Sequence, residues 1–176
     1  MVAVRQLETS ELEAGLDDVR RAPKDNGLLE LIVRRPASGE RELLEEGQID
    51  LIDGLVGDYW AGTASRDKQI TVMNARAALL VAHTKERLPL AGDQLIIDMD
   101  ISAENTPPGT RLAIGSAIIE VSDKPHTGCK KFVGHYGMAA MEFVNSPTGR
   151  ELNLRGINAR VIQPGVVRVG DRVRKV

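Results

Sequence analysis

The sequence is poor in cysteine and has no long apolar run. Cys129 is the only cysteine among 176 residues, so the chain cannot form an intrachain disulfide. This cysteine usage is typical of a reducing compartment, and we expect a cytoplasmic protein. The opening stretch MVAVRQLETSELEAGLDD has no apolar segment of the kind found in a signal peptide. No run approaches the roughly 20 apolar residues of a membrane-spanning helix. We therefore expect no membrane association.

Aromatic residues are also scarce, at 3% of the sequence, and the net charge of −2 is close to neutral. Proteins that bind single-stranded nucleic acid stack bases on aromatic side chains and usually carry a basic field. Neither feature is present, so we expect no nucleic-acid partner. A chain of this length is long enough for one domain with a proper core.

The N-terminal part predicts a helix, and the rest predicts mainly strands. Apolar residues recur at helical spacing over residues 8–21, so we assign residues 1–26 to an N-terminal helical segment. Further helices are expected from Asn74 to about Lys85 and over residues 137–145.

Residues 27–176 are expected to form the main domain. Its strands are predicted at residues 28–34, 94–101, 111–121 and 156–162, with a terminal β-hairpin turning at Gly170 and Asp171. Short strands, frequent glycines and few helices favour a mainly β fold. We predict a closed or partly open antiparallel β-barrel with helices outside it.

The segment SDKPHTGCKKF, residues 122–132, gathers the most reactive side chains. Cys129 lies three residues after His126 and directly before Lys130 and Lys131. Nearby cations favour the nucleophilic thiolate, and ammonium groups also bind anions. The preceding strand indicates that Cys129 lies on a loop held by a rigid scaffold. The alternative is a buried cysteine that packs as a small hydrophobe.

Two other segments contain candidate site residues. Asp58 follows two glycines in GLVGDYWAG, a pattern that is usually only a turn. Lys68 lies in a charged stretch before a short strand and could add to an anion site. Asp98 and Asp100 share one face of a predicted strand and could bind a metal, although a solvent-facing role is the more expected one.

Several segments, in order, resemble the MOSC domain, a module named from the C-terminal part of molybdenum cofactor sulfurases. The segments are GLVGD at 54–58, KQITV at 68–72, LAIG at 112–115, IEV at 119–121, PHTGC at 125–129, RGINARV at 155–161, GVV at 165–167 and GDRV at 170–173. The sequence is most similar to short, stand-alone bacterial members. Many members have Gly-Glu-Asn-Leu before the cysteine strand, where this chain has GDQL at residues 92–95.

The resemblance implies a MOSC-like β-barrel that binds the molybdenum cofactor. It implies that Cys129 is the family's exposed cysteine, which ligates molybdenum or relays sulfur as a persulfide. By position it also implies that Asp58, Lys68, His126 and Arg155 are pocket residues. Together with Lys130 and Lys131, these form the predicted cofactor-binding set.

The resemblance also implies partners. The chain has no PLP-binding aminotransferase-like domain, so a separate protein would donate the sulfur. Some relatives reduce N-hydroxylated compounds with a partner reductase. Edge strands of a small barrel could also pair between chains as a homodimer.

Two further functions remain open from the sequence. One is a non-catalytic binding module for an anionic or phosphorylated small molecule, in which the lysines bind the ligand and Cys129 is incidental. The other is a structural or partner-binding barrel. The reactivity of the thiol distinguishes this last function, because a buried cysteine does not react with a mild alkylating reagent.

Overall fold

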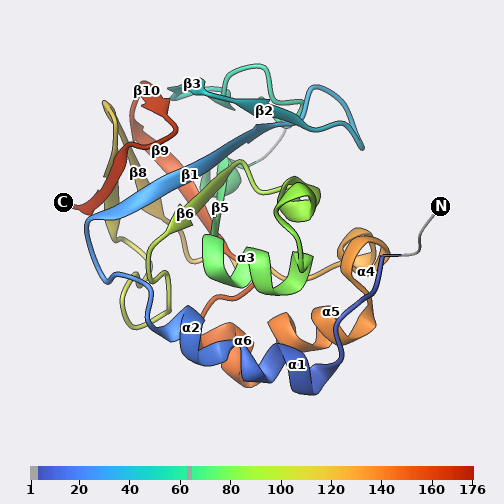
Figure 1. Ribbon diagram of the computed structural model, residues 1–176. Helices are drawn as coiled ribbons and strands as arrows, with labels where there is room; N and C mark the ends of the chain where they lie inside the picture. Colours follow the sequence, from blue (N-terminus) through green and yellow to red (C-terminus); the bar gives the residue numbers. More distant parts are fainter. Residues whose placement is uncertain (1–3, 63–64) are drawn as a thin grey trace.

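The computed structural model describes residues 4–62 and 65–176 and shows a closed, mainly antiparallel β-barrel of seven strands (Figure 1). Each strand pairs with the next, and pairing of the first with the last closes the barrel. Among the strand pairs of the described residues, only β5–β6 is parallel. In spatial order the strands are β11 (Arg172–Lys175), β7 (Arg111–Ile114), β8 (Ala117–Val121), β9 (Ile157–Gln163), β5 (Ile70–Asn74), β6 (Leu95–Asp98) and β1 (Gly27–Arg34). The predicted fold class is confirmed.

A smaller sheet and one edge strand extend the barrel. β2 (Glu42–Leu44) pairs with the C-terminal end of β1, from Ile32 to Arg34. β3 (Glu46–Asp50) lies between β4 (Gly54–Leu55) and β10 (Gly165–Arg168) in the three-stranded sheet. These short strands lie beside the barrel, which is closed by the pairing of β1 with β11.

The prediction of a terminal β-hairpin is wrong, because its two strands do not pair with each other. The turn forms where expected, with Gly170 at φ +95° and a hydrogen bond from the Asp171 amide to the Arg168 carbonyl. However, β10 pairs with β3, whereas β11 pairs with β7 and β1. The alternation of valine and arginine is the same for either arrangement, so the sequence pattern could not select the partner strand.

The barrel interior is filled by aliphatic side chains that alternate along the strands. In β9, Ile157, Ala159 and Val161 are all buried in the interior cluster. β8 contributes Ile119 and Val121 to the same cluster. Every second residue of these strands thus belongs to the interior cluster, the pattern expected of a strand with one face on a core.

The helices form a layer on one side of the barrel (Figure 1). In chain order the α-helices are α1 (Thr9–Ala14), α2 (Leu16–Arg20), α3 (Ala75–Ala82), α4 (Lys130–Tyr136), α5 (Met138–Asn145) and α6 (Pro147–Glu151). The 3₁₀ helices are η1 (Arg66–Lys68), which lies against β9, and η2 (Lys85–Ala91), which packs on α3. A second apolar cluster, which includes Leu12, Val81 and Phe143, fills the space between the helices and the barrel.

Three helix predictions need correction. The helix predicted over residues 8–21 is two helices that meet at Gly15, where a Cβ atom would lie 2.4 Å from Leu80 Cδ1 of α3. α3 ends earlier than predicted because His83 adopts the left-handed conformation, with φ +67°. α4 begins directly after Cys129, in a segment that we expected to remain a loop. The helix predicted over residues 137–145 is confirmed as α5.

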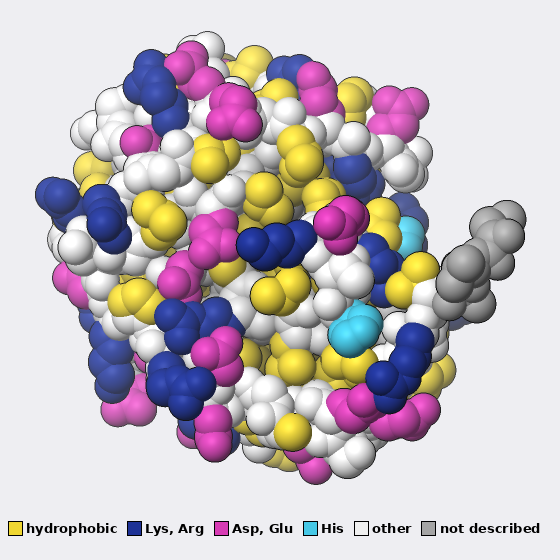
Figure 2. Space-filling model, in the orientation of Figure 1, with side chains coloured by type: hydrophobic (Ala, Val, Ile, Leu, Met, Phe, Trp, Pro, Cys, Tyr) yellow, Lys and Arg dark blue, Asp and Glu magenta, His cyan; other side chains and the backbone are white. Residues whose placement is uncertain are grey.

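The described helices are all too short or too polar to cross a membrane. Figure 2 shows one face of the molecule, where basic and acidic side chains are interspersed. This face therefore has no large patch of a single charge.

Asn74 connects the barrel to the helical layer, and its removal tests this junction. Its side chain accepts hydrogen bonds from the Arg76 and Ala77 amides and donates one to the Met99 carbonyl. Asn74→Ala removes the α3 cap and leaves a buried carbonyl without its partner, so we expect a loss of about 2–4 kcal/mol in the free energy of unfolding. Chemical denaturation measures it.

The control is Leu79→Ala on the same helix, because Leu79 is 39% exposed. It should change stability by less than about 1 kcal/mol. Equal effects of the two substitutions would contradict the junction role of Asn74.

Candidate functional site

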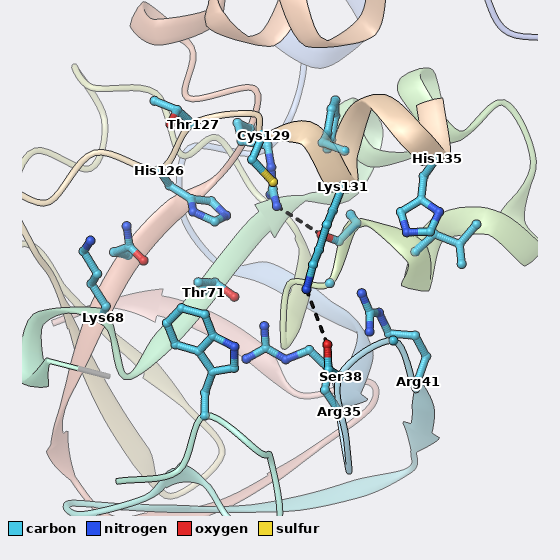
Figure 3. Close-up of a pocket in the computed structure, with 18 of the residues that line it drawn as sticks. Arg35, Ser38, Arg41, Lys68, Thr71, His126, Thr127, Cys129, Lys131 and His135 are labelled. Carbon is cyan, nitrogen blue, oxygen red and sulfur yellow. Dashed lines mark hydrogen bonds between the residues drawn. The ribbon is translucent and has the colours of Figure 1, made fainter. Parts of the chain in front are cut away.

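A pocket of about 420 Å³ opens beside the end of β8, between the cysteine loop, α4 and the turn that connects β1 to β2. Its wall also includes Thr71 of β5, Asn158 of β9 and Lys68 of η1. Figure 3 shows side chains from these separate segments pointing toward one cavity. The volume lies in the range of ordinary small-molecule sites, about 300–1,000 Å³.

The cysteine loop is held at both ends by asparagine side chains. Asn158 donates hydrogen bonds to the carbonyls of Lys124 and Pro125. Asn145 of α5 accepts a hydrogen bond from the Gly128 amide at 2.9 Å. Cys129 follows this anchored loop, is exposed and lines the pocket. The prediction that Cys129 lies on a loop held by a scaffold is confirmed, and the alternative of a buried cysteine is wrong.

Most of the predicted site residues lie around this cavity. Cys129, Lys68, His126, Lys131 and Arg155 all line it. In Figure 3, Cys129 lies between His126 on one side and Lys131 on the other.

Lys130 and Asp58 are not part of the pocket wall. Lys130 is exposed at the start of α4. Asp58 is buried behind the wall, where it holds Arg35. Asp58 Oδ1 and Oδ2 accept hydrogen bonds from Arg35 Nη2 at 2.8 Å and from Arg35 Nε at 2.9 Å. Asp58 therefore fixes a pocket arginine from behind.

Arg35 is held against two aromatic rings at the pocket. Its guanidinium carbon lies 5.4 Å from the Tyr59 ring centroid and 5.7 Å from that of Trp60. The Trp60 amide also donates to Asp58 Oδ1. The segment GLVGDYWAG thus supplies rigid flat surfaces to the pocket, a role that its turn-like sequence did not indicate.

A buried carboxylate, Asp93, connects two of the predicted site residues. His126 Nε2 lies 2.9 Å from Asp93 Oδ1, and Arg155 Nη1 lies 2.5 Å from Asp93 Oδ2. Burial raises the pKa of Asp93, but the charges of Arg155 and His126 outweigh it and hold that pKa at about 2. Asp93 is therefore an anion that orients both side chains toward the pocket.

The absence of a side chain at Gly156 lets His126 approach Asp93. Gly156 has φ +114°, and a Cβ atom there would lie 2.5 Å from the Val72 carbonyl oxygen and 3.1 Å from His126 Cδ2. A larger residue would be strained and would push against the imidazole. Gly156 within RGINARV is therefore needed for the His126–Asp93 contact.

The pocket wall is strongly positive. Among the described residues that line it, five are Lys or Arg, two are histidines, and none is aspartate or glutamate. Arg35 and Arg155 are neutralised from behind by Asp58 and Asp93. Arg155 Nε is buried and has no hydrogen-bond partner within the described part of the chain. A group that accepts hydrogen bonds is the natural complement to such a wall.

Several site residues were not found from the sequence. Asp93 lies in GDQL, which the sequence marked only as a variation on the family pattern. Arg35, Ser38, Arg41 and His135 had no distinguishing pattern at all. They reach the cavity only because the β1–β2 turn and α4 meet there.

The suggested metal site at Asp98 and Asp100 is not supported. Asp98 pairs with Arg76, and Asp100 Oδ1 accepts the Ser102 amide. Over residues 4–62 and 65–176, no group of three or more His, Cys, Asp or Glu side chains is placed to hold a metal ion.

A closed β-barrel with a helical layer and a cysteine-lined pocket defines the structural class. The MOSC domain sequence model matches residues 45–174. The match spans more than half of the chain, which therefore belongs to the MOSC domain family, a family associated with the molybdenum cofactor. No curated protein matches the sequence.

Solved structures share the fold at low sequence identity. The YuaD protein from Bacillus subtilis has a TM-score of 0.65 and 16% identity, and the alignment covers 84% of this chain and 94% of that one. YiiM from Escherichia coli has a TM-score of 0.57 and 22% identity, with coverage of 85% and 69%. At these identities the similarity shows the fold alone.

The Asp93 network should make stability depend on acid pH. Because the pKa of Asp93 is lower in the folded state than its usual 3.8, its stabilising effect is present above about pH 4 and is lost as pH falls toward 2. This loss should be about 2 kcal/mol in the wild type. Asp93→Asn should lose less stability over this pH window, while it is destabilised at neutral pH by about 3–5 kcal/mol because Arg155 is left without its counter-ion.

Urea unfolding between pH 2 and 7 measures both effects. Asp123→Asn is the control, because the Asp123 side chain is 72% exposed. Its unfolding free energy should remain within about 0.5 kcal/mol of wild type. Parallel pH curves for wild type and Asp93→Asn would show that Asp93 does not carry the acid sensitivity.

Proposed function

We propose that this protein binds the molybdenum cofactor or carries sulfur for it, with Cys129 as the residue that holds molybdenum or a persulfide. The observation that carries the proposal is one pocket that combines an exposed thiol with a cationic wall free of carboxylates. Family membership supports the same conclusion, because it connects the chain with this cofactor.

The residues present fit the chemistry of the group. The cofactor is an anionic, phosphate-bearing pterin, which suits the cationic side chains of Lys68 and Lys131 in the pocket wall. The pterin dithiolene holds most of the metal coordination, so one soft protein thiolate is enough. When bound, the cofactor would supply redox or sulfur-binding chemistry that the protein side chains lack.

The chain's own residues would bind and orient the ligand. Cys129 offers its sulfur from a loop anchored by Asn145 and Asn158. Asp93 fixes the ring of His126, three residues before the thiol, so one imidazole nitrogen is directed to Asp93. The other is left to accept or donate a proton at the pocket side.

Both forms of the proposal need a partner. Persulfide relay requires a sulfur donor, and cofactor-dependent reduction of N-hydroxylated compounds requires a reductase. Either partner must reach Cys129, which its exposure permits. We keep both as alternatives within one site, because each uses the same thiol.

Loss of the Cys129 thiol should remove the bound cofactor or the persulfide. Protein purified from cells that make the cofactor should contain molybdenum and pterin, or one added sulfur atom on Cys129. Cys129→Ala should remove the molybdenum or the added sulfur while it leaves the fold intact. Metal analysis measures the molybdenum, fluorescence measures the pterin, and intact mass spectrometry measures the added sulfur.

The control is Met138→Leu, which changes another exposed sulfur-containing residue outside the pocket. Met138→Leu should contain as much molybdenum or added sulfur as the wild type. If the wild type contains neither molybdenum nor persulfide, or if Cys129→Ala contains as much as wild type, the proposed role of Cys129 is wrong.

A second function is favoured by the same cationic wall. A non-catalytic module for an anionic or phosphorylated small molecule would need the cations but not the thiol. Its support is the absence of any carboxylate from the pocket lining. Lys131 is then a main contact, since it lines the pocket and extends toward Ser38 (Figure 3).

Two neighbouring lysines test the cationic wall, and Cys129→Ala distinguishes this function from the first. Lys131→Ala should abolish thermal stabilisation by phosphorylated small molecules, because it removes a pocket cation. Lys130→Ala is the matched control, because Lys130 lies on the same helix but outside the pocket. Cys129→Ala should also retain the stabilisation. Equal losses in both lysine variants would point to nonspecific charge effects.

A further inference from the structure

Two distant segments bring basic side chains together at one end of the pocket. Ser38 and Arg41 lie on the turn between β1 and β2, and Lys131 and His135 lie one turn apart on α4. Lys131 Nζ is 3.5 Å from Ser38 Oγ. Figure 3 shows His135 above Arg41, and the ammonium group of Lys131 beside Ser38. We call these four residues the basic end.

Within the part of the chain that the structure describes, no carboxylate neutralises the basic end. Arg41 Nε donates to the Pro89 carbonyl at 3.0 Å, and Arg41 Nη1 donates to the Glu40 carbonyl at 2.8 Å. Neutral carbonyls thus fix the guanidinium and leave its charge uncompensated. The adjacent Glu42 pairs with Arg34 instead. Among the ion pairs of the described residues, none includes Arg41 or Lys131.

The pKa of His135 is lowered, in part by this excess of positive charge. Partial burial lowers the pKa of His135, and the charges of Arg41 and Arg87 lower it further. Arg87 lies behind the histidine and donates to the His135 and Ala82 carbonyls. The charges that act on the His135 ring are therefore positive, and an anion placed among them would relieve their repulsion.

We infer that the basic end is an anion subsite for the phosphate group of a small molecule, separate from the thiol at Cys129. Guanidinium, ammonium, imidazole and hydroxyl groups approach from two opposite walls, which suits a tetrahedral anion with several acceptor oxygens. The inference rests on the proposed function only in taking this pocket as the ligand site. The phosphate could belong to the pterin cofactor or to a separate phosphorylated reactant.

Inorganic phosphate tests the subsite without any cofactor. The probe is titrated into protein made in cells that lack the pterin cofactor, and NMR follows the ring resonances of the three histidines. His135 should shift and saturate, while His83, at the end of α3 and outside this pocket, should not. Arg41→Gln should weaken the phosphate affinity about tenfold, because it removes one charge-assisted contact.

Lys130→Gln is the charge-matched control, because it removes one positive charge from α4 outside the pocket. Its phosphate affinity should equal that of wild type. Three outcomes overturn the inference: no saturable shift of His135, equal weakening by Arg41→Gln and Lys130→Gln, or a saturable shift confined to His126.

The cofactor-loaded protein distinguishes the two sources of phosphate. Loss of the His135 response after loading would assign the basic end to the cofactor's own phosphate. A retained response would assign it to a separate phosphorylated reactant. Phosphate binding at His135 without any role for Cys129 would overturn only the proposed function, and a metal-binding Cys129 without phosphate binding would overturn only this inference.

Discussion

The buried Asp93 carboxylate is the constraint on which the site depends. A charge that is removed from water must be paired, and Asp93 is paired by Arg155 and His126. These three residues come from the end of η2, from the segment before β9 and from the cysteine loop. One ion-pair network therefore fixes the positions of segments that are more than 60 residues apart in sequence, and it orients two pocket side chains.

The pocket arginines are held in two different ways. Asp93 and Asp58 stand behind Arg155 and Arg35, so that these guanidiniums are rigid and charge-balanced. Arg41 is instead held by backbone carbonyls and keeps its charge. Rigid, neutralised arginines shape a pocket, whereas uncompensated cations attract an anion. Cys129 lies across the cavity from Arg35 and Arg41 (Figure 3), so a ligand held by the cations would face the thiol.

The barrel explains why a reactive loop can be held so firmly. β8 and β9 are both part of a closed, aliphatic core, and Asn158 of β9 holds the loop that leaves β8. The helical layer supplies the second anchor through Asn145. Cys129 is thus exposed without being loosely placed, which is the arrangement expected of a functional loop on a rigid scaffold.

The sequence by itself determined the fold class, the positions of most strands along the chain, the prominence of Cys129 and the family, because alternation, turn residues and short motifs are local features. The tertiary structure alone decided that β10 and β11 pair in different sheets, that Asp93 joins His126 to Arg155, and that Arg41 and Lys131 line one pocket. Strand partners and buried ion pairs depend on chain segments that meet only after folding. Local periodicity contains no information about which of several equally suitable partners will be adjacent.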